Sequence, residues 1–144
     1  MQLIDELSKK KYYLLLIIGK PGSGKSKYLH NYSKQEGIPV LDLDFILGKE
    51  IPDGKDNNYV YDFVSGFLDT YTPKQVLLDK KAILYHKNSN IDLLEFLKKL
   101  SKQKTVISTW NGYTEDGKLY HLNEKGEVDF KYDLSDDYAY IELK

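Results

Sequence analysis

The feature that most limits how this chain can fold is a glycine-rich stretch that follows a continuous apolar run. Residues 12–18 read YYLLLII, as expected of a strand buried on both faces of a sheet. Directly after them, residues 19–26 read GKPGSGKS, a full match to G-x-x-x-x-G-K-[ST]. A helix is expected over Ser26–Glu36, with Gly37 at its C-cap. Strand, glycine loop and helix in this order predict a phosphate-binding loop.

Each part of this loop has a chemical role toward ATP and Mg²⁺, the expected cofactors. The glycines allow successive backbone N–H groups to point into one anion-binding concavity. The helix that begins there adds the positive end of its dipole. Lys25 can reach the β- and γ-phosphates, and the hydroxyl of Ser26 can ligate the magnesium ion. The residues expected to bind the nucleotide are Gly22, Ser23, Gly24, Lys25, Ser26 and Lys27.

A second apolar segment ends in an acid. Residues 76–79 read VLLD, the pattern of a Walker B strand, which would place Asp79 beside the magnesium ion together with Ser26. NTPases of this class often carry a glutamate directly after that aspartate to polarise the attacking water. Here the next residues are Lys80 and Lys81. The sequence therefore predicts nucleotide binding, and it does not predict fast hydrolysis.

The fourth strand expected, Thr105–Trp110, leads into Asn111 and Gly112. In P-loop NTPases with an additional strand, a polar residue at this strand tip senses the γ-phosphate, and ligands of open α/β sheets bind at such strand ends. Asn111 is the first choice for this role and, with Asp79, a candidate catalytic residue; Thr109 is the second choice. The other interpretation is that Asn111 and Gly112 form a simple turn. Trp110 is expected to pack in the core.

The order of elements predicts an α/β protein of the P-loop NTPase fold, with an ASCE or AAA-like core, in a single domain over residues 1–144. A mostly parallel sheet should carry helices on both faces, followed by a C-terminal β-hairpin and an edge strand. The expected strands are 12–18, 39–43, 76–79 and 105–110, the helices 26–36, 59–70 and 92–102, the hairpin 118–122 with 128–133, the last strand 138–143, and a polar loop 48–58.

Composition excludes several classes of protein. With no cysteine among 144 residues, disulfides and thiolate chemistry are excluded. No segment has the roughly 18 apolar residues that a membrane span needs, and the N-terminal charge order is wrong for a signal peptide, so a cytoplasmic protein is expected. All 21 basic residues are lysines. The chain therefore cannot supply an arginine finger or a bidentate guanidinium clamp.

Three segments together resemble the BrxF family of small P-loop proteins from type 3 BREX bacteriophage-defence systems. They are IIGKPGSGKS, VLLD, and TVISTWNGYTEDGKLYH followed by a DYAYI strand. The resemblance implies a nucleotide-binding accessory component that acts with other BREX proteins on DNA. It extends by motif to Gly24, Lys25, Ser26 and Asp79, and by local match to residues 110–112. Lys80 and Lys81 depart from the partly acidic run of the family.

A different hypothesis is a small-molecule kinase. Asp42 and Asp44 follow the second strand much as the acids of shikimate-kinase-like enzymes do, where they hold the acceptor hydroxyl. The missing arginines count against it, because those kinases use arginines for anionic substrates and for the lid over ATP. Helix capping or solvation is the simpler interpretation of both acids. A third hypothesis, a pure interaction domain with a vestigial phosphate loop, is disfavoured because the phosphate-loop motif is intact. The sequence does not determine whether the protein forms an oligomer.

Overall fold

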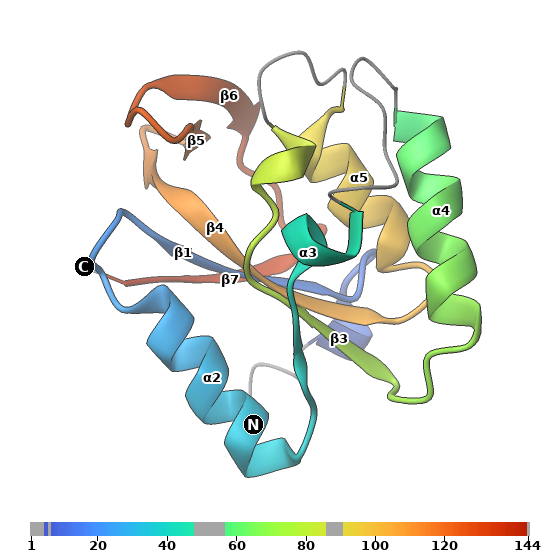
Figure 1. Ribbon diagram of the computed structural model, residues 1–144. Helices are drawn as coiled ribbons and strands as arrows, with labels where there is room; N and C mark the ends of the chain where they lie inside the picture. Colours follow the sequence, from blue (N-terminus) through green and yellow to red (C-terminus); the bar gives the residue numbers. More distant parts are fainter. Residues whose placement is uncertain (1–4, 6, 48–56, 86–90, 144) are drawn as a thin grey trace.

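The computed structural model describes residues 5, 7–47, 57–85 and 91–143. Its centre is a parallel sheet in the order β2-β3-β4-β1-β7 (Figure 1). These strands are β1 (Leu14–Gly19), β2 (Val40–Leu41), β3 (Gln75–Leu78), β4 (Thr105–Glu115) and β7 (Ala139–Glu142). Because β4 lies between β1 and β3, the sheet has the additional strand of the predicted P-loop NTPase fold, and β7 is its edge strand as expected.

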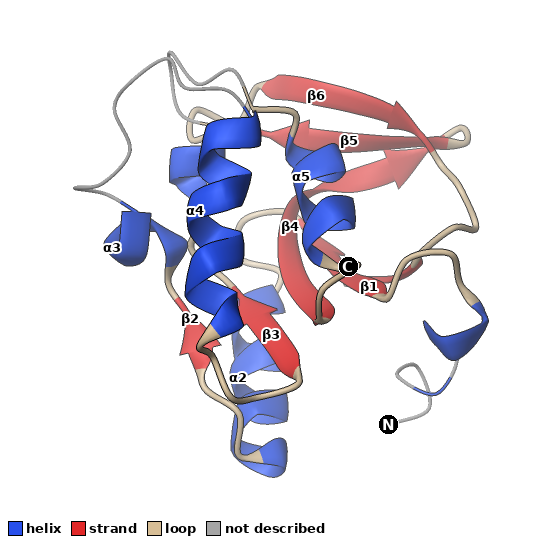
Figure 2. Ribbon diagram, turned by 90° about the vertical axis from the view of Figure 1, so that its right-hand side faces the viewer, coloured by secondary structure: helices blue, strands red, loops and turns tan. Residues whose placement is uncertain are grey.

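Helices cover both faces of this sheet (Figure 2). The helices are α2 (Lys25–Glu36), α3 (Leu43–Leu47), α4 (Asn57–Asp69) and α5 (Leu93–Leu100), with 3-10 turns at Leu7–Lys9 and Ala82–Leu84. Leu15 and Ile17 of β1 pack in a cluster with Leu29 of α2. Leu14 and Leu16, which point the other way, pack in the larger cluster that includes α3, α4 and α5. Burial on both faces explains why this strand is an unbroken apolar run.

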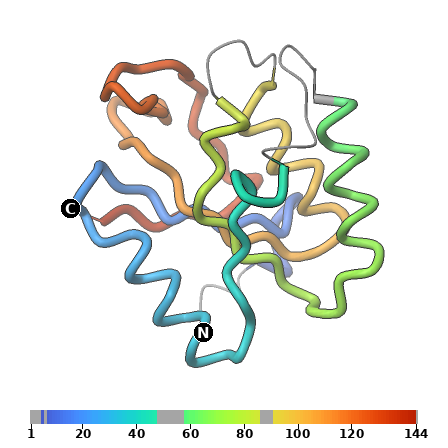
Figure 3. Tube along the Cα trace, viewed as in Figure 1, coloured from blue at the N-terminus to red at the C-terminus, as the bar shows by residue number. Residues whose placement is uncertain are grey.

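The structure contradicts the interpretation of Asn111 and Gly112 as a simple turn after the fourth strand. Asn111 and Gly112 do not form a turn, because β4 continues to Glu115 before the chain reverses at Asp116 and Gly117. The continued strand pairs antiparallel with β5 (Lys118–Leu122), which pairs with β6 (Val128–Asp133), so the predicted hairpin extends β4 (Figure 3). A Cβ at position 112 would collide with the carbonyl oxygen of Tyr120, so this close strand pairing requires glycine.

Other predicted boundaries need smaller corrections. The second strand is only Val40–Leu41, since the Asp42 carboxylate accepts a hydrogen bond from the Phe45 N–H (3.0 Å) and so starts α3 at Leu43. Of the predicted loop 48–58, residues 48–56 lie outside the described part of the chain, and residues 57 and 58 already belong to α4. Among the described residues, no helix is both long and apolar enough to cross a membrane.

Candidate nucleotide and magnesium site

The phosphate loop joins the end of β1 to the start of α2 at the edge of the sheet where the parallel strands end. Gly22 (φ 83°) and Gly24 (φ 95°) adopt left-handed backbone conformations that residues with a Cβ rarely adopt. Gly19 is needed for another reason, because a Cβ there would overlap the Ser23 hydroxyl. The glycine spacing read from the sequence is therefore dictated by the shape of the loop, and α2 begins at Lys25 immediately after it.

The two residues predicted to hold the metal lie together. Asp79 directly follows β3, and its Oδ1 accepts a hydrogen bond from the Ser26 hydroxyl (3.1 Å). The Asp79 side chain is 14% exposed, and its Oδ2 lies 3.7 Å from Nε2 of His30. A hydroxyl beside a carboxylate is an all-oxygen donor set, which suits Mg²⁺. Ser26 and Asp79 are thus the residues that could hold this ion.

Lys25 stands next to this pair. Its Nζ donates a hydrogen bond to the Lys20 carbonyl (3.4 Å), across the loop. Burial lowers the pKa of Lys25, and the nearby Asp79 carboxylate opposes this shift. Lys27, in the first turn of α2, has an exposed side chain. A half-buried ammonium at the start of a helix is suited to a polyanionic ligand.

A buried lysine that the sequence interpretation did not assign to the site lies beneath Asp79. Lys81 is only 4% exposed, and its Nζ donates to the Asp79 carbonyl (3.0 Å) and to the Thr109 hydroxyl (3.0 Å). Thr109, the second choice for a sensor, also lies 3.0 Å from Oδ1 of Asp79. Burial lowers the pKa of Lys81 to about 7, with Asp79 acting in the opposite direction. Thr109 and Lys81 therefore position the aspartate.

Asn111, the first choice for a sensor, is hydrogen-bonded to the hairpin and also lines the candidate site. Its Nδ2 donates to the Leu122 carbonyl (3.0 Å), whereas its Oδ1 is buried with no partner among the described residues. Asn111 lines a cavity of about 250 Å³ beside the phosphate loop. Of the predicted site residues, the cavity brings together Lys25, Ser26, Asp79 and Asn111, and it does not include residues 22–24 or Lys27. Its other lining residues are Asp44, Lys80, Lys81, Ala82, Tyr85, Thr109 and His121.

His121 is the other wall residue that sequence reasoning missed. It is buried on β5, on the same side of the strand as Leu119. The alternation of the segment KLYHL, which puts His121 on the same face as an apolar leucine, could have indicated from the sequence that this histidine is buried. Only the pairing of β5 with β4 shows which site it lies beside. Glu95, an acid on α5, is exposed.

The acids of the kinase hypothesis hold local structure. Asp42 caps α3, which is the simpler interpretation given above. Asp44 lines the cavity, and its Oδ1 accepts a hydrogen bond from the backbone N–H of Ile83 (2.8 Å). Each carboxylate thus has one oxygen engaged by a backbone N–H group.

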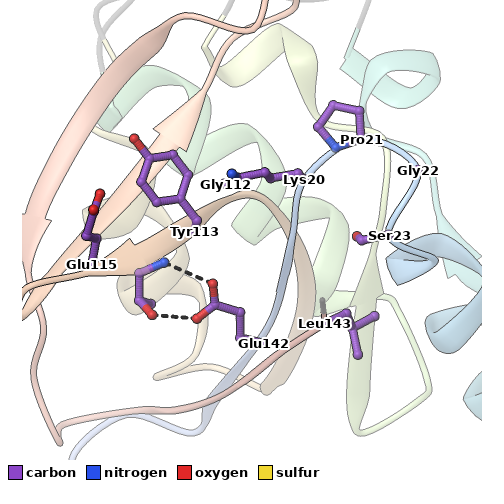
Figure 4. Close-up of a pocket in the computed structure, with 10 residues that line it drawn as sticks. Lys20, Pro21, Gly22, Ser23, Gly112, Tyr113, Glu115, Glu142 and Leu143 are labelled. Atoms are coloured by element: carbon purple, nitrogen blue, oxygen red, sulfur yellow. Dashed lines mark hydrogen bonds between the residues drawn. The ribbon is translucent and has the colours of Figure 1, made fainter.

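A larger cavity, of about 760 Å³, borders the opposite side of the phosphate loop, between residues 20–23 and the ends of β4 and β7 (Figure 4). Lys20 extends its ammonium over the ring of Tyr113, 4.9 Å from the centroid. The Glu142 carboxylate accepts hydrogen bonds from the backbone N–H and the hydroxyl of Thr114. Lys25, Ser26 and Asp79 line the smaller cavity, whereas Gly22 and Ser23 line the larger one, so the phosphate loop borders both cavities and volume does not identify the candidate site.

Comparison with known proteins adds little to this geometry. No family model and no curated protein matches the sequence. A solved structure, AMPPCP-bound DnaA from Aquifex aeolicus, is similar at 14% identity and a TM-score of 0.38, over 99% of this chain and 44% of that chain. The chain thus spans less than half the length of that protein, and a likeness this weak carries no argument. The strand order and the phosphate loop themselves define the class, a P-loop NTPase fold.

Proposed function

We propose that this chain is a P-loop protein that binds ATP with Mg²⁺ and hydrolyses it slowly on its own. The carrying observation is the 3.1 Å hydrogen bond between Ser26 of the loop and Asp79 at the end of β3. Lys25 and the N–H groups at the start of α2 supply the positive field that a triphosphate needs. Mg²⁺, when bound, neutralises charge between the β- and γ-phosphates.

The proposal of slow hydrolysis rests on what lies around Asp79. The glutamate position is occupied by Lys80, and the chain has no arginine to stabilise charge on the transferred phosphoryl group. An arginine finger is worth roughly 10³ to 10⁵ in rate. A partner protein could supply this group, so stimulation by a partner belongs to the proposal.

We also propose a setting for this activity, an accessory role in a bacterial BREX anti-phage defence complex in the cytoplasm. Its support is the resemblance of three segments to the BrxF family: the phosphate loop, VLLD, and the block from Thr105 to His121 with the DYAYI strand. Other BREX proteins would be the partners, and DNA would be reached through the complex.

Nucleotide binding is tested by calorimetric titration of ATP with Mg²⁺ into the wild type and Lys25→Ala. Loss of one charge-assisted contact costs about 1.5–3 kcal/mol, so the affinity should fall roughly 10- to 100-fold. Lys34→Ala, which removes an exposed lysine from the last turn of the same helix, is the matched control and should bind like the wild type. Equal affinities for all three proteins would refute the proposal.

The defence role is tested in cells that carry a type 3 BREX system and lack this chain. Expression of the wild type should restore resistance to phage, whereas Lys25→Ala, made to the same level, should not. Resistance that is the same with and without the chain would exclude the role and leave nucleotide binding untouched.

A further inference from the structure

A histidine–aspartate pair lies across the C-terminal hairpin. Nδ1 of His121 on β5 is 2.7 Å from Oδ1 of Asp129 on β6, and their side chains are 1% and 18% exposed. A carboxylate can only accept a hydrogen bond, so Nδ1 carries the proton. When the ring is neutral, the other nitrogen, Nε2, keeps its lone pair, which is the state of a histidine that accepts a proton.

The surroundings fix this ring and keep it neutral. Tyr85, Trp110 and Phe130 meet the imidazole edge-on, with centroids 4.4, 5.0 and 6.0 Å away. Burial lowers the pKa of His121; Asp129 opposes the shift, and Lys81 and Lys25 reinforce it. The histidine is therefore neutral at pH 7 and able to accept a proton.

The hairpin brings this pair to the candidate site. His121 lies opposite Gly112 in the pairing of β4 with β5, and Gly112 directly follows Asn111 within β4. It lines the same cavity of about 250 Å³ as Lys25, Ser26 and Asp79.

Each carboxylate of that cavity has one oxygen in a hydrogen bond within the protein. Among the described residues that line it, the acids are Asp44 and Asp79. Asp79 accepts from Ser26, and Asp44 accepts from the Ile83 N–H. The residue directly after Asp79, where many P-loop NTPases carry a catalytic glutamate, is Lys80. The wall also holds two buried basic side chains, Lys81 and His121. Nζ of Lys81 already donates to the Asp79 carbonyl and the Thr109 hydroxyl, which leaves the His121 imidazole as the candidate base.

We propose that His121, oriented by Asp129, is the general base for ATP hydrolysis in this chain; the inference rests on the function proposed above. Nε2 takes a proton from water as its oxygen bonds to the γ-phosphorus. The bond from that phosphorus to the β,γ-bridging oxygen breaks, and its electron pair leaves with ADP. Asp129 stabilises the imidazolium, which then releases its proton to phosphate or solvent. The catalytic base comes from the hairpin rather than from the Walker B strand.

The test measures the rate of ATP hydrolysis by His121→Gln, Asp129→Asn and the wild type. Each protein is in excess over labelled ATP, so that slow hydrolysis can be detected. ATP affinity should stay close to that of the wild type, while the rate in His121→Gln should fall by roughly 10² or more. In the wild type the rate should rise with pH through the lowered pKa of His121, below about 6.5, and this rise should be absent in His121→Gln. Asp133→Asn, the same change at an exposed position of β6, should behave like the wild type.

Several results would overturn the assignment. One is a His121→Gln protein with the wild-type rate and pH profile. Another is a wild-type protein that binds ATP but hydrolyses it no faster than the Lys25→Ala variant does. A rise with pH that disappears in Asp44→Asn and persists in His121→Gln would make Asp44 the base. If His121→Gln does not fold, Asp129→Asn decides, because it keeps the ring and must still lower the rate. Wild type that fails to bind ATP would instead refute the proposed function.

Discussion

The Ser26 hydroxyl donates a hydrogen bond to Oδ1 of Asp79 over 3.1 Å, although 53 residues separate them in the sequence. The serine is fixed by the first turn of α2, and the aspartate by the end of β3. Since β4 lies between β1 and β3, the contact passes β4 at Thr109, whose hydroxyl lies 3.0 Å from the same Oδ1. Two oxygen groups that we propose as Mg²⁺ ligands are therefore positioned by separate elements.

Asp79→Asn should separate metal binding from nucleotide binding. Asparagine keeps an acceptor for Ser26 but removes the negative charge, so the Mg²⁺ affinity of the ATP complex should fall roughly 10- to 100-fold. Binding of ATP without metal should change little. Titration of Mg²⁺ into the ATP complex measures metal binding, and titration of ATP in the presence of EDTA measures metal-free nucleotide binding. Asp133→Asn is the control in both. Undiminished Mg²⁺ dependence would mean that VLLD is only a core strand.

The isolated protein should turn over ATP well below about 1 s⁻¹, the lower end of the usual enzyme range. The reason is the missing glutamate after Asp79 and the missing arginine. Phosphate release from highly purified protein measures the rate, and Lys25→Ala identifies the contaminating background. Turnover above that value that disappears in Lys25→Ala would show that a further catalytic group had been overlooked.

Lys81 should make the stability of the protein depend on pH. Its pKa is about 7 when folded against 10.5 for an ordinary lysine, so between these values the unfolded chain binds more protons than the folded one. The free energy of unfolding should rise by about 1 kcal/mol per pH unit from pH 7 to 9. Urea unfolding at several pH values measures it, and Lys81→Met should lack this rise. Parallel curves for both proteins would contradict a buried, neutralised amine.

Two glycine substitutions should have opposite effects. Gly112→Ala forces a methyl group against the Tyr120 carbonyl and should cost about 1–3 kcal/mol of stability. Gly66→Ala, in α4 where a Cβ meets open space, should stabilise the fold by about 0.5–1 kcal/mol. Thermal unfolding of both compares them directly. A Gly112→Ala protein as stable as the wild type would mean that the β4–β5 pairing relaxes easily.

The local chemistry of this protein was readable from its sequence. The phosphate loop, VLLD and the strand–helix order needed only residue spacing, because backbone geometry restricts which residues can form such a loop between a strand and a helix. The glycines at positions 22 and 24 illustrate this, since their positive φ values exclude most other residues. Asp79 was assigned for the same reason: a strand end is a local property.

The tertiary structure decided what reaches the site from a distance. Asn111 continues a strand because residues 112–115 pair with β5 across the turn at Asp116 and Gly117, a hairpin that the sequence interpretation did not include. The burial of Lys81 beneath Asp79 follows from the packing of β3 against β4. His121 enters the wall of the cavity because the hairpin folds back along β4. The pairing of strands determines these positions, between distant segments for Lys81 and across a hairpin for Asn111 and His121, whereas local spacing determines the loop.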